Sequence, residues 1–185
     1  MRIIAGQFRS RRLKSVPGPA VRPTPDRLRE SLFNILAPRI PGTVFLDAYA
    51  GSGAVGIEAF SRGAKHVVLI ERNKQALEII RENVASLGIA DDVSIVRGEA
   101  AVLLRNYPCD IAFVDPPYEQ TSEYTNTVTA LSETPCGLVV AQHPSRLILE
   151  DTYGALQKTR IVKQGDNSLS FYERLNRTAH EAPAE

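Results

Sequence analysis

The chain has 185 residues, of which 43% are hydrophobic, and its formal net charge is +1. This length and composition predict one compact domain, and no apolar run reaches the roughly 20 residues that a membrane-spanning helix needs. The first residues lack the pattern of a signal peptide, and Cys109 and Cys136 lack the spacing of a disulfide framework or a zinc site, so we expect a cytoplasmic protein without a metal or a membrane.

The N-terminal part of the chain is strongly basic. The first 40 residues hold nine Lys or Arg against two acidic residues, a net charge of +7, whereas the other 145 residues hold 13 against 19, a net charge of −6. Residues 2–8 and 11–16 flank a short connection and predict a β-hairpin or extended arm, which we assign to residues 1–20. A basic patch on a mildly acidic body indicates a polyanion partner, with a solvated arm as the alternative.

A helix is predicted after this arm. Thr24 and Pro25 suit an N-cap followed by proline at the first helical position. An apolar stripe at helical spacing then runs to Pro38, and we interpret it as packing: it consists of Leu28, Leu32, Phe33, Ile35 and Leu36. Arg27 and Arg29 lie off that stripe, where they can either contact a ligand or pair with nearby acidic residues.

From residue 43 onward, strand and helix patterns alternate. Apolar strands that alternate with helices predict a parallel sheet covered on both faces. The end of the chain predicts an antiparallel hairpin around residues 165–168. The predicted strands are 44–47, 66–71, 92–96, 110–114 and 137–141, and the predicted helices are 54–61, 73–87, 99–105 and 123–131.

A glycine-rich turn joins the first of these strands to its helix. Gly51, Gly53 and Gly56 have the GxGxxG spacing of dinucleotide-binding folds, and Glu71 ends the next strand 20 positions after Gly51. Glycines allow a ligand to approach the backbone closely, and a carboxylate at that strand end can bind ribose hydroxyls. A nicotinamide cofactor and a tight turn without a ligand are both alternatives at this point.

Three features favour S-adenosylmethionine over a nicotinamide cofactor. Asp47 precedes the glycine turn, where it can hold the ammonium group of a methionine moiety. Glu99 and Ala100 follow the third strand, where they can contact an adenine edge. The motif Asp115-Pro116-Pro117-Tyr118 follows the fourth strand and suits methylation of an amine better than hydride transfer. The full set of expected cofactor-binding residues is Asp47, Tyr49, Ala50, Gly51, Gly53, Glu71, Arg72, Glu99 and Ala100.

The expected catalytic residues are Asp115, Pro116, Pro117 and Tyr118. The prolines fix φ and supply no N–H group, and a residue that precedes proline is driven to an extended conformation. The Asp115 carboxylate and the Pro116 carbonyl then form two adjacent acceptors for an exocyclic NH₂ group, beside the face of Tyr118. Tyr118 is expected to stack on a base that has left its own stack. Tyr49 is a candidate for a cation–π contact with a sulfonium or for loop packing.

Several segments together resemble the RsmD family, bacterial methyltransferases that modify the N2 amine of one guanine in 16S ribosomal RNA. The resemblance is carried by residues 2–7, 22–36, 45–59 and 114–118. It implies a class I methyltransferase fold with a seven-stranded, mostly parallel sheet, S-adenosylmethionine as donor with S-adenosylhomocysteine as product, and the small ribosomal subunit or its assembly intermediate as partner. Where the family often has Glu after the fifth strand, this sequence has Gln142-His143, to which we assign no role.

On this interpretation the chain divides into an RNA-binding arm, residues 1–20, a methyltransferase domain, residues 21–175, and a tail, residues 176–185, expected to be disordered. We expect deletion of residues 1–16 to weaken RNA binding and to spare the cofactor. The alternatives are a DNA adenine or cytosine amino-methyltransferase, a nicotinamide-binding Rossmann protein and a noncatalytic RNA-binding module. The expected RNA contacts are Arg9, Arg11, Arg12, Lys14, Arg22, Arg27 and Arg29.

Overall fold

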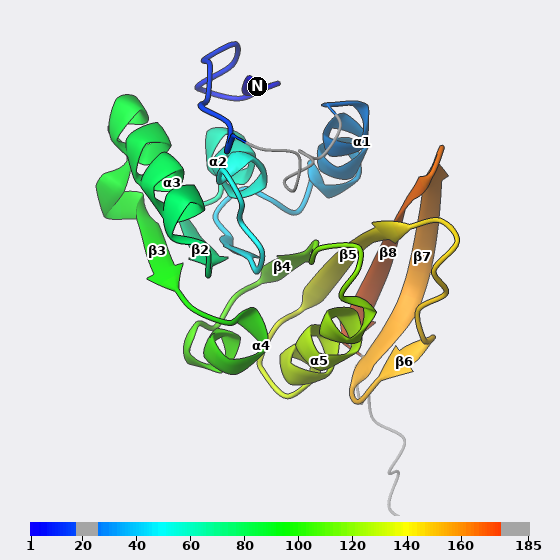
Figure 1. Cartoon of the computed structure of the whole chain (residues 1–185). Helices are drawn as coiled ribbons and strands as arrows, with labels where there is room; N and C mark the ends of the chain where they lie inside the picture. The colour runs from blue at the N-terminus through cyan, green and yellow to red at the C-terminus, as the bar shows by residue number, and fades with distance from the viewer. Residues whose placement is uncertain (18–25, 175–185) are drawn as a thin grey trace, which may run out of the picture.

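Strands and helices alternate along most of the chain, as the sequence predicts. The structure, a computed structural model, describes residues 1–17 and 26–174. Figure 1 shows one sheet with helices on either side of it. The strands are β1 Val44–Asp47, β2 His66–Glu71, β3 Val93–Arg97, β4 Ile111–Val114, β5 Leu138–Pro144, β6 Thr152–Tyr153, β7 Leu156–Gln164 and β8 Asn167–Arg174. The helices are α1 Asp26–Leu36, α2 Ala54–Ser61, α3 Lys74–Leu87, α4 Ala100–Leu103 and α5 Thr121–Ser132, with single 3-10 turns at Ala90–Asp92 and Leu104–Asn106.

The sheet has the order β3-β2-β1-β4-β5-β8-β7-β6. The first five strands of the chain pair in parallel, and β8 and β7 close the sheet as an antiparallel hairpin. The predicted fold class is therefore confirmed. Among the described residues the sheet has eight strands, one more than the seven that the resemblance implies, because Thr152–Tyr153 adds a short strand. A strand of two residues is too short to show a period-2 pattern, so spacing could not have predicted it.

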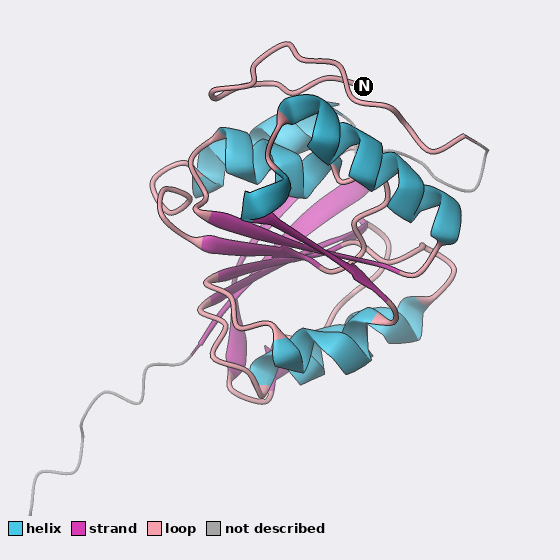
Figure 2. Ribbon diagram, turned by 90° about the vertical axis from the view of Figure 1, so that its left-hand side faces the viewer, coloured by secondary structure: helices cyan, strands magenta, loops and turns pink. Residues whose placement is uncertain are grey.

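Helices cover both faces of the sheet. Helices α1, α2 and α3 lie on one face, and α4 and α5 lie on the other, as Figure 2 shows edge-on. Each face has its own apolar cluster: Phe45 and Ile57 belong to the first, and Leu46 and Tyr124 to the second. Because successive residues of a strand point to opposite faces, a continuous apolar strand such as β1 contributes to both clusters.

Local signals place the ends of the helices next to the sheet. The Asn73 side chain accepts a hydrogen bond from the backbone N–H of Ala76 and caps α3, while Gly88, at a φ of 71°, ends it. Gly56 lies where α2 crosses the sheet. A Cβ atom there would lie 2.3 Å from Leu69 Cδ2 and 2.8 Å from Val67 Cγ1, so a larger residue would force these two buried side chains to shift.

The N-terminal segment, residues 1–17, folds back on itself in an irregular way, where the sequence predicts a β-hairpin or an extended arm. Arg2 and Arg12 form an antiparallel bridge, and a turn over residues 7–10 joins its two sides. Next to the bridge, the backbone N–H groups of Ile3 and Leu13 donate to the carbonyls of Arg11 and Met1, both at 3.0 Å. In Figure 2 the segment runs along the outside of the upper helices. The Glu58 carboxylate of α2 accepts hydrogen bonds from the backbone of Ile4 and Ala5, at 2.8 and 3.0 Å. The two sides of the segment pair with each other over a short stretch and also bond to α2 and α3, so the pairing is shorter than the strand pattern indicates.

The expected helix start at Thr24-Pro25 and the expected tail at 176–185 lie outside the described residues. None of the helices in the described part of the chain is long and apolar enough to cross a membrane.

Candidate functional site

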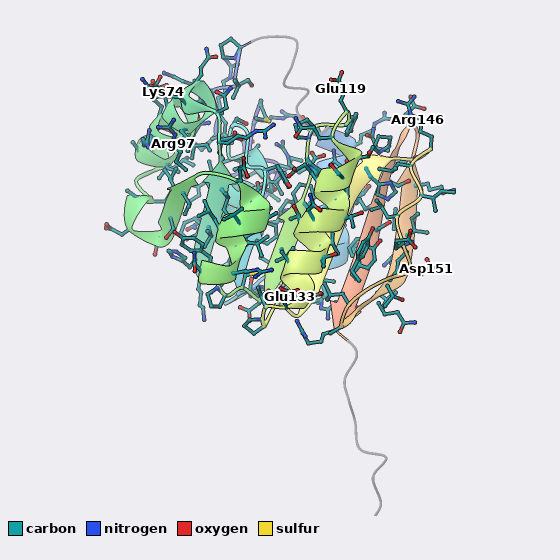
Figure 3. The ribbon with its side chains drawn as sticks, turned by 60° about the horizontal axis from the view of Figure 1, so that its bottom comes forward. Lys74, Arg97, Glu119, Glu133, Arg146 and Asp151 are labelled. Atoms are coloured by element: carbon teal, nitrogen blue, oxygen red, sulfur yellow. The ribbon has the colours of Figure 1, made fainter. Side chains whose placement is uncertain are left out.

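A cavity of about 600 Å³ lies at the carboxyl ends of β1, β2, β3 and β4. This is the point where the strand order reverses between β1 and β4, the usual ligand position in an open parallel sheet. Figure 3 shows the same end of the molecule at its top, with Lys74, Arg97, Glu119 and Arg146, and the opposite end with Glu133 and Asp151. The predicted site residues that line the cavity are Asp47, Tyr49, Ala50, Gly51, Glu71, Arg72, Glu99, Ala100, Asp115, Pro116, Pro117 and Tyr118.

Asp47 ends β1 at the floor of this cavity. Its side chain is only 1% exposed. The oxygen Oδ2 accepts a 3.2 Å hydrogen bond from the backbone N–H of Gly56, whereas Oδ1 has no hydrogen-bond partner among the described residues. Burial raises the pKa of Asp47 to about 7, against the opposing effect of the backbone N–H groups of Gly56 and Tyr49. An unpaired, buried carboxylate oxygen that lines a cavity suits a cationic ligand group.

Glu71 ends β2 and binds the glycine turn directly. Its Oε2 accepts from the backbone N–H of Gly51, and its Oε1 accepts from that of Asn73, both at 2.8 Å. Gly51 and Gly53 have φ angles of 55° and 81°, left-handed values that favour glycine. Gly53 does not line the cavity and instead precedes α2. Each carboxylate oxygen has a second acceptor site, so Glu71 can bind ligand hydroxyls while it holds the turn.

The third strand contributes the far wall of the cavity. Gly98, which follows β3, donates its N–H to the carbonyl of Glu71 at 3.1 Å and so ties the two strand ends together. Glu99 is exposed and Ala100 is buried where α4 begins. Arg72 donates to the side-chain oxygen of Gln120 at 3.1 Å, a contact between the end of β2 and the residue before α5.

Tyr49 lines the cavity, and its hydroxyl packs against α5. Its hydroxyl contacts Glu123 Oε2 at 2.8 Å and Thr127 Oγ1 at 2.5 Å, both on α5. Burial raises the pKa of the Tyr49 hydroxyl well above its usual value, so the group stays protonated. These contacts hold the start of the glycine turn against α5, the helix that follows Asp115–Tyr118.

The segment Asp115–Tyr118 leaves β4 and borders the cavity. Asp115 and Tyr118 are half-buried, Pro116 is buried and Pro117 is exposed. The carbonyl of Pro117 accepts from the backbone N–H of Gln120 at 2.8 Å. The hydroxyl of Tyr118 donates to Asn167 Oδ1 at 2.6 Å. That bond fixes one end of the tyrosine ring to the start of β8.

Two parts of the site were missed by sequence reasoning. Asn167 lies 49 positions after Tyr118, and the sequence indicates only a hairpin there. Met1, Ser15 and Val16 line the cavity as well. The expectation that deletion of residues 1–16 spares the cofactor stays a prediction, and this lining argues against it. Contacts between distant segments have no local sequence pattern, so neither group could have been found by spacing.

The predicted RNA-binding cations fall into different environments. Arg9, Arg11, Arg12 and Lys14 are exposed on the N-terminal segment, and Arg27 is exposed on α1. Two of them also contact α3: Arg11 donates to the carbonyl of Ser86 at 3.0 Å, and Lys14 pairs with Glu82 at 2.8 Å. Arg22 lies outside the described residues.

Arg29 does not take the RNA-contacting position that the sequence predicts. Its side chain is 0% exposed, and it donates to the carbonyl of Arg2 and to Asp26 Oδ1, at 2.6 and 3.0 Å. Burial lowers the pKa of Arg29, and the nearby Glu58 opposes that shift. A guanidinium in this position connects α1 to the N-terminal segment and does not face solvent, which supports the structural alternative that the sequence left open.

In the residues that the structure describes, no group of three or more His, Cys, Asp or Glu side chains is arranged to hold a metal ion.

Comparisons with known proteins agree with this geometry. The family described as conserved hypothetical protein 95 matches residues 1–173. The candidate rRNA methyltransferase YlbH of Bacillus subtilis is 33% identical over 183 residues, which cover 94% of this chain and 99% of that protein. Ribosomal RNA small subunit methyltransferase D of Escherichia coli K12 is 43% identical over 122 residues, 65% of this chain and 61% of that protein. The solved structure of yhhF, a candidate methyltransferase of Escherichia coli, has a TM-score of 0.79 at 34% identity and covers 94% of this chain and 97% of that one.

Proposed function

Because the chain belongs to the RsmD family of ribosomal RNA methyltransferases, we propose that it methylates the exocyclic N2 amine of a guanine in 16S ribosomal RNA. The donor is S-adenosylmethionine and the product is S-adenosylhomocysteine. The substrate is the RNA within the small ribosomal subunit or its assembly intermediate. Guanine and its N2 atom come from the family resemblance, whereas the residues themselves indicate methylation of an amine.

The observation that carries this proposal is the pairing of two features in one cavity. The buried Asp47 presents an oxygen with no partner among the described residues, which suits a cation, and Asp115 follows β4, the strand that pairs with β1. A methyl donor with an ammonium group and an amine acceptor would need these two features close together. A nicotinamide cofactor has no use for the second feature.

The residues around the cavity suit each part of S-adenosylmethionine. Asp47 would hold its ammonium group, and Glu71 would accept hydrogen bonds from the ribose hydroxyls. Glu99 and Ala100 would contact the adenine edge. The turn through Gly51 would allow the donor to approach the backbone closely. When bound, the donor supplies a methyl group made electrophilic by its sulfonium.

The acceptor side must align a poorly nucleophilic amine. The lone pair of the guanine N2 atom is delocalised into the ring. If the Asp115 carboxylate and the Pro116 carbonyl accept hydrogen bonds from the two N–H groups of this amine, the nitrogen becomes more tetrahedral. Its lone pair then points toward the methyl group. Attack forms the N–C bond as the C–S bond breaks, and the extra proton leaves to solvent. Alignment therefore contributes more than a strong base does.

Tyr118 would hold the base during this step. Its ring would stack on a guanine that has left its neighbours in the RNA, replacing part of the lost stacking. The hydrogen bond from Tyr118 to Asn167 supports this role, because it restricts how the ring can turn. The exposed cations Arg9, Arg11 and Arg12 would contact the RNA phosphates.

Mass-spectrometric mapping of methylated nucleosides tests the proposal. Ribosomal RNA from cells with and without this protein should differ by one N2-methylguanine in the small-subunit RNA. In parallel, labelled S-adenosylmethionine should label small ribosomal subunits and leave duplex DNA unlabelled. Labelling of duplex DNA alone would point to a DNA amino-methyltransferase instead.

A further inference from the structure

Asn83 joins the N-terminal segment to the glycine turn of the cavity. It lies on α3 and is only 2% exposed. Its Oδ1 accepts from the backbone N–H of Lys14 at 2.8 Å. Its Nδ2 donates to the carbonyl of Lys14 and to the carbonyl of Ser52, both at 3.0 Å. One buried amide therefore bonds two segments that are 38 positions apart in the sequence.

The partners of Asn83 fix the orientation of its amide. Two of them are carbonyl oxygens and one is an N–H group. A flipped amide would place its oxygen against two carbonyls and its NH₂ against a donor, which is unfavourable in a buried position. Neither segment can move far from α3 without leaving part of this amide unpaired.

The two bonded segments serve the two proposed ligands. Ser52 lies between Gly51 and Gly53, in the turn that Glu71 also holds. Lys14 belongs to the N-terminal segment, which carries the exposed cations proposed for RNA, and the next two residues, Ser15 and Val16, line the cavity. Asn83 is thus a direct hydrogen-bonded connection between the two segments.

We propose that Asn83 is a positioning residue that couples RNA binding by the N-terminal segment to cofactor binding at the glycine turn. The inference rests on the proposed function, because it assigns RNA to one segment and the methyl donor to the other. RNA that orders residues near Lys14 also orders Asn83 and, through its amide, the carbonyl of Ser52. Cofactor binding then loses less conformational entropy in the glycine turn. The coupling is therefore positive, and by linkage it is reciprocal.

The coupling is measurable as a ratio of affinities. The affinity of the protein for S-adenosylhomocysteine is measured by calorimetry alone and with saturating, unmethylated small-subunit rRNA transcript or small ribosomal subunits. In the wild-type protein we expect RNA to tighten this affinity at least ~5-fold. In Asn83→Ala we expect the ratio to fall below about 2-fold. A purely structural role would weaken binding equally with and without RNA and would leave the ratio unchanged.

Glu82→Gln is the matched control. Glu82 neighbours Asn83 and pairs with the same Lys14, but through the exposed side chain and without a bond to Ser52. Its loss should leave the wild-type ratio intact, because exposed ion pairs contribute little.

The wild-type ratio tests the coupling between RNA and cofactor binding even if Asn83→Ala fails to fold. A wild-type protein that methylates rRNA but binds S-adenosylhomocysteine equally with and without RNA would refute the coupling and leave the proposed function standing. An unchanged ratio in folded Asn83→Ala would refute the role of Asn83. A wild-type protein that neither binds nor methylates rRNA would overturn both proposals.

Discussion

At the scale of single residues, Asp47 has opposite effects on the stability of the free protein and on ligand binding. An Asp carboxyl group in water has an ordinary pKa of 3.8, and burial raises the pKa of Asp47 to about 7 in the folded protein. Protonation of Asp47 therefore contributes most to the free energy of unfolding below about pH 4. This contribution is lost as the pH rises through about 7. Above pH 7 the folded protein holds an ionised, buried carboxylate, which is the form that a cationic ligand group needs.

Asp47→Asn should stabilise the free protein more at high pH than at low pH. The variant keeps an acceptor for the N–H of Gly56 and removes the buried charge. Relative to the wild type, its free energy of unfolding should rise by about 3 kcal/mol more at pH 8 than at pH 5. Urea unfolding at both pH values measures this difference. An equal effect at both would mean that Asp47 titrates normally.

The same carboxyl group should make cofactor binding depend on pH. In the wild type the dissociation constant for S-adenosylhomocysteine should be roughly tenfold higher at pH 6 than at pH 7.5, because binding at pH 6 must first remove a proton from Asp47. In Asp47→Asn binding should be weaker at both pH values and should lose this dependence. Calorimetry at the two pH values provides the measurement, and a flat wild-type profile would argue against contact between Asp47 and the ammonium group.

Asp115→Ala should separate catalysis from cofactor binding. The variant should bind S-adenosylhomocysteine with wild-type affinity, because Asp115 lies on the acceptor side of the cavity. Methyl transfer to small-subunit RNA should fall by about 10²-fold or more, the size of the loss of one aligned polar contact in a transition state. Single-turnover assays with labelled donor measure the rate. Near-normal turnover would show that this carboxylate does not hold the amine.

At the scale of elements, the approach of α2 to the sheet positions Asp47. Gly56 donates its N–H to Asp47, and its missing side chain lets α2 lie against Leu69 and Val67. Gly56→Ala should therefore lower the free energy of unfolding by ~1–3 kcal/mol through overpacking, and it should also weaken cofactor binding by displacing the N–H group.

Gly137→Ala is the matched control for this substitution. The nearest atom to a Cβ at Gly137 is the carbonyl oxygen of Asp110, at 3.4 Å, and no residue of the cavity is involved. Its effect on thermal unfolding and on S-adenosylhomocysteine affinity should be small. If the two substitutions proved equally mild, the close contact of α2 with β2 would not matter for the site.

At the scale of the whole molecule, the N-terminal segment both carries exposed cations and lines the cavity. Because Met1, Ser15 and Val16 line the cavity, deletion of residues 1–16 should weaken the binding of both the cofactor and RNA. The double substitution Arg9→Gln and Arg12→Gln should instead weaken RNA binding and leave cofactor binding unchanged. The slope of log affinity against log salt should become shallower by about 1–1.5, since each lost phosphate contact contributes roughly 0.7 with single strands. Salt titrations of RNA binding, with calorimetry of S-adenosylhomocysteine, distinguish the two variants.

Local sequence patterns were sufficient to predict strands β1 to β5 and most of the proposed cofactor-binding and catalytic residues that border the cavity. Apolar runs, Asn73 and Gly88 placed strands and helices to within a few residues, because these signals act over short stretches of chain. Asp47 and Glu71 end β1 and β2, whereas Glu99 and Asp115 follow β3 and β4. The carboxyl ends of parallel strands meet at one edge of a sheet. Motif order along the chain was therefore enough to predict that these residues lie together.

The roles of the remaining residues depend on how the folded chain packs. Packing buried Arg29, turned Tyr49 toward α5, bonded Tyr118 to Asn167 and brought Lys14 and Ser52 to the same amide of Asn83. Each of these outcomes requires contacts between segments far apart in the sequence. Their geometry is set by the way the helices lie on the sheet, and no local pattern records it.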